Sequence, residues 1–99
     1  MAAIGILTLE LRLPESHSLK DKRHTVKSLK DRLRSRFNVA VAEIDFQDIW
    51  QRSLISAVTV SASRPYAEQT LQQVEREAAS LLGPALVDVT IEWIEQGHE

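Results

Sequence analysis

The amino-acid sequence predicts an α+β fold in which four strands and two helices follow one another in the order βαββαβ. Two observations lead to this prediction. Apolar residues recur every three or four positions in two segments, and they alternate with polar residues in four others. The chain has 99 residues, with only three glycines and three prolines and no linker or repeat. We therefore expect a single domain spanning residues 1–99.

The first strand and the first helix follow from residues 4–36. Leucines occupy every second position from Leu7 to Leu13, which is typical of a strand with one buried face, and Pro14 ends it. Ser18 followed by Asp21 is close to a capping box at a helix N-terminus. We expect the helix from about Leu19 to Arg36. Its apolar positions are Leu19, Val26, Leu29, Leu33 and Phe37.

The remaining elements alternate in the same way. Residues 39–46 and 50–63 predict two strands joined as a hairpin, and the second of these has Leu54, Val58 and Val60 on one parity. Ser63 and Pro65 open a second helix, which Gly83-Pro84 closes. The last strand has its apolar residues at alternate positions. They are Val87, Val89, Ile91 and Trp93.

This order predicts the ferredoxin-like arrangement, an antiparallel sheet of order 4-1-3-2 with both helices on one face. The topology also predicts which turns lie together. The turn from Pro14 to His17, the hairpin tip from Phe46 to Trp50, and Gly83-Pro84 should share one end of the sheet.

Charge is distributed unevenly along the chain. The formal net charge is −2, yet residues 12–36 hold nine basic and three acidic residues, a local charge of +6. Residues 37–99 hold three basic and ten acidic residues, a local charge of −7. The distribution of charge matters more than its total for the choice of partner, so a nucleic-acid partner stays open.

Composition excludes several classes of protein. The chain has no cysteine, which removes disulfide scaffolds, thiolate metal sites and cysteine nucleophiles. No apolar run approaches the ~20 residues of a membrane span. Residues 1–9 lack the basic start and the cleavage site of a signal peptide. We therefore expect a cytoplasmic protein without a membrane partner.

Three segments carry a resemblance to a known family. They are His17-Ser18-Leu19-Lys20-Asp21-Lys22-Arg23, the stretch from Arg32 to Glu43, and Asp48-Ile49-Trp50-Gln51-Arg52. Together they resemble the YlxP-like bacterial family, a domain of unknown function. The resemblance implies a ferredoxin-like fold and a cytoplasmic bacterial protein. It also implies a link to translation or ribosome maturation, because genes of this family often lie beside those for a translation initiation factor and a ribosome-binding factor.

Basic residues form a stripe along the first helix. At 100° per residue, five of them fall within roughly 80° of one another. They are Lys20, Arg23, Lys27, Lys30 and Arg34. We expect no acid at a spacing of four to relieve this row, so its cations repel one another. A polyanion would relieve them, and the stripe therefore predicts phosphate binding. The alternative is a solvated face whose long stems cover the apolar rim.

Structured RNA is the polyanion that fits this helix best. Recognition of single strands on a ferredoxin-like sheet usually needs aromatic residues on the central strands. Residues 4–13 and 54–63 contain none. Contacts from the first helix to the backbone of a structured RNA or a ribosomal particle are the better interpretation.

The hairpin tip is the second candidate, since the topology brings it near His17. We interpret Trp50 as capping the edge of the core, with Asp48 fixing the turn or pairing with Arg52. The alternative is that Trp50 stacks on a partner and that Arg52 contacts phosphate or protein.

Enzyme chemistry has little support in the sequence. His17 and His24 have no further ligands at metal spacing, and His98 lies in a tail that we expect to fray. The turn that begins at Pro14 lacks the glycine-rich phosphate loop of acylphosphatases. We expect no metal, cofactor or small-molecule substrate.

We therefore expect a small non-catalytic protein that contacts structured RNA or the ribosome through its first helix. Besides the five stripe residues, the predicted contacts are Lys22, Arg36 and Arg52, with His17, Asp48 and Trp50 as further partner contacts. The alternative is a homo-oligomeric protein-interaction module that binds no nucleic acid. In that case either the predicted edge strand of residues 87–93 pairs with a second copy, or the acidic sheet of one copy meets the basic helix of another.

Overall fold

The predicted βαββαβ order is confirmed by the computed structural model, which describes residues 2–96. His98 lies outside these residues. The first helix has the predicted bounds, and the strands differ from their predicted ends by a few residues. The elements are β1 (Ala2–Arg12), α1 (Leu19–Arg36), β2 (Ala40–Asp45), β3 (Arg52–Ser61), α2 (Arg64–Leu82), a 3-10 turn (Gly83–Ala85) and β4 (Leu86–Gln96).

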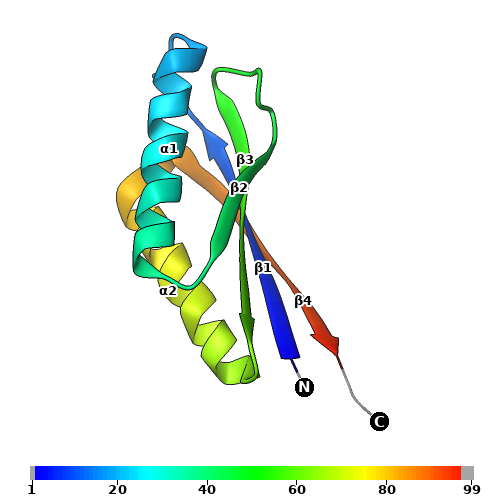
Figure 1. Ribbon diagram of the computed structural model, residues 1–99. Coiled ribbons are helices and arrows are strands. Elements are labelled where there is room, and N and C mark those ends of the chain that lie inside the picture. The colour runs from blue at the N-terminus through cyan, green and yellow to red at the C-terminus, as the bar shows by residue number, and fades with distance from the viewer. Residues whose placement is uncertain (1, 97–99) are drawn as a thin grey trace.

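The four strands form one antiparallel sheet in the order β2-β3-β1-β4, which is the predicted order counted from the opposite edge. Both helices lie on one face of this sheet (Figure 1). The structure therefore has two layers, and within residues 2–96 the second face of the sheet is left uncovered. None of the helices in this range is long and apolar enough to cross a membrane.

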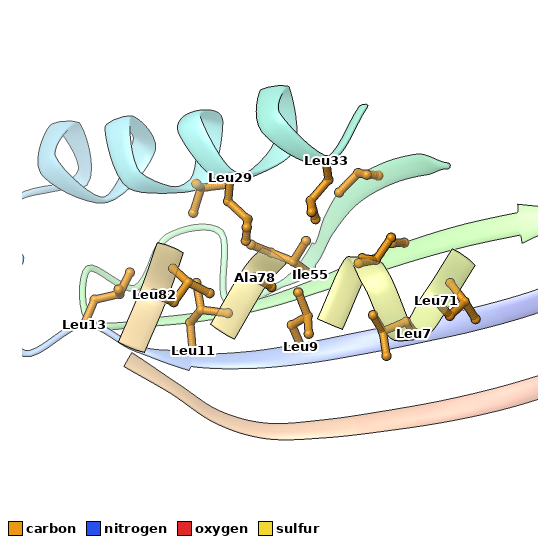
Figure 2. Close-up of a cluster of buried hydrophobic side chains, with 14 residues drawn as sticks. Leu7, Leu9, Leu11, Leu13, Leu29, Leu33, Ile55, Leu71, Ala78 and Leu82 are labelled. Carbon is orange, nitrogen blue, oxygen red and sulfur yellow. The ribbon is translucent and has the colours of Figure 1, made fainter. Parts of the chain in front are cut away.

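The core lies between the sheet and the two helices. Leu7, Leu9 and Leu11 of β1 are fully buried there, as their alternation predicts. Leu29 and Leu33 of α1 point toward the sheet from above it (Figure 2). From α2 the core receives Leu71, Val74, Ala78 and Leu82.

On β3, the residues that face the helices are not the most apolar ones of the strand. Ser53, Ile55, Ala57 and Thr59 face the helices and are buried. Leu54, Val58 and Val60 fall on the alternate positions, so they lie on the uncovered face, where they pair in register with residues such as Ile4 and Ile6 of β1. Apart from Ile55, the residues of β3 under the helices are therefore smaller or more polar than those on the uncovered face.

Both helices begin at the predicted caps. Ser18 Oγ accepts a hydrogen bond from the backbone N–H of Asp21 at 3.1 Å, and Asp21 Oδ2 accepts one from the N–H of His17 at 3.1 Å. Ser63 Oγ caps α2 in the same way, accepting from the N–H of Tyr66 at 3.2 Å. These bonds satisfy backbone donors that a helix N-terminus would otherwise leave free.

A close packing contact at Gly5 fixes the distance between β1 and α2. A Cβ at this position would lie 2.6 Å from Leu71 Cδ1 and 2.8 Å from Trp93 Cζ3. We expect Gly5→Ala to lower the free energy of unfolding by about 1–3 kcal/mol through overpacking, as measured by chemical denaturation. Adding Leu71→Val should make the combined loss smaller than the sum of the two single losses. Strictly additive losses would contradict this explanation.

Candidate functional site

A groove of about 470 Å³ lies between α1 and the loop that joins β2 to β3. The N-terminal half of α1 runs beside this loop (Figure 1). One wall consists of four basic side chains from α1, and the other includes Gln47 and Asp48 of the loop. The four basic residues are Arg23, Lys27, Lys30 and Arg34. Four of the five predicted stripe residues therefore share one groove, while Lys20 is exposed and does not line it.

Lys22 is buried, so its prediction as a nucleic-acid contact is corrected. Its side chain is only 2% exposed, and its Nζ lies 2.9 Å from Glu43 Oε2. Nζ also donates to the backbone carbonyl of Phe46. Ser53 Oγ donates to the same Glu43 oxygen at 2.6 Å. The charged group is thus paired and hydrogen-bonded within the protein, as a buried charge must be.

The loop that forms the far wall is held in an unusual backbone conformation. Phe46 has φ 65°, in the left-handed region that residues other than glycine seldom adopt. Its carbonyl accepts bonds from Lys22 Nζ and from the N–H of Ile49 at 3.0 Å. Its own N–H donates to Asp45 Oδ1 at 2.7 Å. Three hydrogen bonds on one residue stabilise this conformation and fix the position of the next two residues.

Asp31 changes the charge of the basic wall, which corrects the expectation that no acid relieves the row. Lys27 Nζ lies 2.5 Å from Asp31 Oδ2, and Arg34 Nη2 lies 3.3 Å from Asp31 Oδ1. The hydrogen bond and charge of Lys27, together with the charge of Arg34, lower the pKa of Asp31. The carboxylate therefore stays ionised at neutral pH and offsets part of the charge of these two cations.

Arg36 lies outside the groove, on the flank of α1 that faces α2. Arg36 Nη1 is 3.1 Å from Glu77 Oε1, and Arg32 Nη1 is 2.9 Å from Glu77 Oε2. The bond from Arg32, assisted by the charge of Arg36, lowers the pKa of Glu77. Arg36 therefore links α1 to α2 and does not line the groove.

Arg52 is also absent from the groove, and it does not pair with Asp48. Its Nη2 lies 3.3 Å from Glu10 Oε2, and its guanidinium carbon lies 4.0 Å from the centre of the Phe46 ring. The interpretation of Trp50 as a cap on the core is wrong, because this residue is 49% exposed. Arg52 thus packs against Phe46 of the loop, and Trp50 is about half exposed.

The expected meeting of turns at one end of the sheet is confirmed. The N–H of Leu13 donates to the carbonyl of Gln51 at 2.9 Å, and a second pocket is bounded by Pro14 and Pro84. His17 is exposed at this end and is bound to Asp21 through its backbone only. Among residues 2–96, no three histidine or acidic side chains are grouped closely enough to hold a metal ion.

Two of the groove cations have no acidic partner among the described residues. Arg23 and Lys30 take part in no ion pair within residues 2–96, and both line the groove, so their charges are available to a ligand. The charge of Lys22 is matched by Glu43 beneath them. A phosphate-rich partner could meet a row of cations here without displacing a buried ion pair.

The most informative residue that sequence reasoning missed is Glu43. It shares its parity on β2 with the buried Val41, so an acidic residue stands where an apolar one is expected. Lys22 likewise stands three residues after Leu19 and four before Val26, within the apolar stripe of α1. Two opposite charges at core-facing positions are the signal that could have identified this ion pair.

Comparison with known proteins settles the family. The family model described as "Protein of unknown function (DUF503)" matches residues 4–91. The chain belongs to the DUF503 family. The uncharacterised protein YlxP of Bacillus subtilis is 39% identical over 71 residues, which cover 72% of this chain and 77% of that protein. The resemblance noted in the sequence is thereby confirmed.

Solved structures confirm the fold of this DUF503 chain. The de novo designed protein Foldit4 superposes with a TM-score of 0.62 at 11% identity, covering 98% of this chain and 100% of that one. A dimeric ferredoxin-like protein of unknown function from Thermobifida fusca superposes with a TM-score of 0.51 at 15% identity, covering 94% and 92%. At these identities the likeness shows the ferredoxin-like fold alone.

The buried ion pair can be tested by removing one partner. We expect Lys22→Met to lower the free energy of unfolding by about 3 kcal/mol, because Glu43 then keeps a poorly solvated charge without its partner. Chemical denaturation measures the loss. The double variant Lys22→Met/Glu43→Gln should recover part of the stability, since it removes the unpaired charge while the amide oxygen of Gln can still accept from Ser53 Oγ. A double variant as unstable as the single one would contradict the pairing.

Proposed function

We propose that this protein binds structured RNA or a ribosomal particle through the groove between α1 and the β2–β3 loop. It does so without catalysis, in the bacterial cytoplasm, in a process of translation or ribosome maturation. The observation that carries the proposal is the row of Arg23, Lys27, Lys30 and Arg34 on a single wall. These residues span about 16 Å of the helix axis, which is long enough to contact several phosphates.

The geometry of the wall favours contacts to a nucleic-acid backbone. Its cations come from a rigid helix whose register is set by a buried ion pair, so their spacing does not depend on a flexible loop. Backbone contacts of this kind recognise the shape of a folded RNA and need no base-specific group.

The uncovered face of the sheet supports the choice of backbone contacts over base stacking. Its central positions, on β1 and β3, hold Ile4, Ile6, Thr8, Ser56 and Val58. Thr8 Oγ1 and Ser56 Oγ are hydrogen-bonded to each other at 2.8 Å. Stacking of single-stranded bases needs aromatic rings, and these strands offer none in this region.

The salt dependence of binding tests the proposal directly. If the four groove cations contact phosphates, the logarithm of the affinity for purified bacterial ribosomal RNA should fall with the logarithm of salt concentration at a slope of roughly −2.8 to −3.6. Filter binding over a salt series measures this slope. Binding that does not change with salt, or no binding at low salt, would overturn the proposal.

A pair of charge-reversal variants locates the binding surface. Arg23→Glu/Lys30→Glu should abolish retention of ribosomal RNA and co-sedimentation with ribosomal subunits at low salt. The matched control is Arg12→Glu/Arg76→Glu, which changes the net charge by the same amount at two exposed residues outside the groove. Equal loss in both variants would show an effect of net charge alone and would contradict a specific groove.

Removing the acid of the wall should strengthen binding. We expect Asp31→Asn to raise the affinity for ribosomal RNA, because Lys27 and Arg34 are then free to contact phosphate. Asp88→Asn, an exposed acid on β4, is the control and should change the affinity less. Weaker binding of Asp31→Asn would contradict the proposed contacts.

A further inference from the structure

The strand β4 forms the edge of the sheet opposite the groove. One side of β4 pairs with β1 from Gln96 back to Leu86, and no described strand pairs with its other side. Edge strands are normally protected from pairing by short length, charged side chains, proline or a β-bulge. Leu86–Gln96 has 11 residues and contains no proline, lysine or arginine. Its bulge lies near one end, at Val87, and the residues from Asp88 onward pair with β1 in unbroken register.

Apolar side chains of β4 are exposed at the edge of the sheet. Ile91 is 41% exposed and lies on the helix-bearing face, in a row with Val89 and Trp93, which are partly buried against the core. Val87 is 46% exposed and lies at the bulge where the pairing with β1 shifts. Because α2 packs mainly on β1 and β3, it leaves the outer part of this row without a cover.

We propose that β4 pairs antiparallel with β4 of a second copy of this chain. The two-fold axis lies midway between the Ile91 residues of the two copies. The two sheets then form one continuous sheet of eight strands, with all four helices on the same face. A two-fold axis perpendicular to the sheet must lie midway between the two copies of one residue, because facing residues in an antiparallel pair belong to the same face. With the axis at Ile91, residues 88–94 pair in regular register, and the bulge at Val87 ends the regular pairing at that point.

The acidic residues of β4 select the same register. With the axis at Ile91, Asp88 faces Ile94 of the second copy and Glu92 faces Thr90, while Glu95 lies beyond the last regular pair, next to the bulge at Val87. No two acids are then opposite each other.

Other registers lose charge compatibility, length or the match of apolar side chains. An axis at Thr90 places Asp88 opposite Glu92 of the second copy, and an axis at Glu92 places that residue opposite itself. Like charges directly opposite each other destabilise a strand pair. An axis at Val89 leaves only residues 88–90 in regular pairing, and an axis at Trp93 places Ile91 opposite Glu95. The Ile91 register avoids all of these faults, as a self-complementary edge requires, and this favours a second copy over an unrelated strand.

The Ile91 register also joins the exposed apolar rows. Ile91 packs on its own counterpart, and Val89 faces Trp93 of the second copy. Trp93 is held in place by the Arg64 guanidinium, whose central carbon lies 3.9 Å from the ring centre, while Arg64 also binds Glu68 and Glu95. Regular pairing of residues 88–94 would add about six to eight backbone hydrogen bonds, which is within the range of a typical protein–protein interface.

Sedimentation of the RNA-free protein tests the pairing. The parent and Val60→Lys should sediment as dimers. Ile91→Lys should sediment as a monomer, because a dimer would bring two ammonium groups together at the axis. Its circular dichroism spectrum should be unchanged, which shows that the fold is intact. Val60 is the matched control because it is 55% exposed on the uncovered face. A monomeric parent at several hundred micromolar would overturn the proposal. A dimer that is dissociated by Val60→Lys and not by Ile91→Lys would also overturn it. A dimer that separates at high salt would overturn it as well, because that behaviour indicates a contact between the basic helix of one copy and the acidic sheet of another.

A disulfide trap tests the register, because the chain has no cysteine of its own. Cβ atoms of facing residues lie about 4.5–5.5 Å apart, close to disulfide distance. Ile91→Cys should therefore form a covalent dimer on mild oxidation, and Val60→Cys should not. Cross-linking of Val60→Cys without Ile91→Cys would overturn the proposal. The groove lies at the opposite edge of the sheet, so this inference and RNA binding can each fail without the other.

Discussion

The arrangement of the groove depends on the buried ion pair between Lys22 and Glu43. A charge with 2% exposure requires a partner at hydrogen-bond distance, because an unpaired ion in the protein interior is strongly destabilising. This requirement fixes how far α1 is rotated about its axis and where it lies along β2. With Lys22 directed inward, Arg23, Lys27 and Lys30 are placed toward the groove by the geometry of the helix alone.

The same ion pair determines the other wall. Lys22 Nζ binds the carbonyl of Phe46, whose left-handed backbone turns the chain toward Gln47 and Asp48. The Phe46 ring lies against the Arg52 guanidinium, which in turn binds Glu10 of β1. One lysine therefore connects the helix, the loop and, through Phe46, the central strand. The strained conformation at Phe46 persists because several contacts require it.

The sequence predicted the elements of this fold because their signals are local. The alternation of leucines in β1 and the Ser18 cap of α1 involve neighbours in the chain, and both are found as predicted. The sequence did not predict which of the two alternating sets of β3 residues is buried, because this depends on how α2 packs on the strand. Lys22 was misplaced for a related reason. Its position in the apolar stripe was visible, but its partner Glu43 lies 21 residues away and is brought near only by the fold.

The fold also changes the meaning of the +6 charge of residues 12–36. Glu77 binds Arg32 and Arg36 on one flank of α1, and Glu43 binds Lys22 beneath it. Asp31 offsets part of the charge on the remaining flank. The positive charge that is left therefore lies mainly on the groove wall, with Arg12 and Lys20 exposed outside it, beside an otherwise acidic protein. A polyanion would be attracted most strongly to that wall, which favours one orientation of the partner over non-specific adhesion. In this way a chain with a net charge of −2 can still present a surface suited to phosphate.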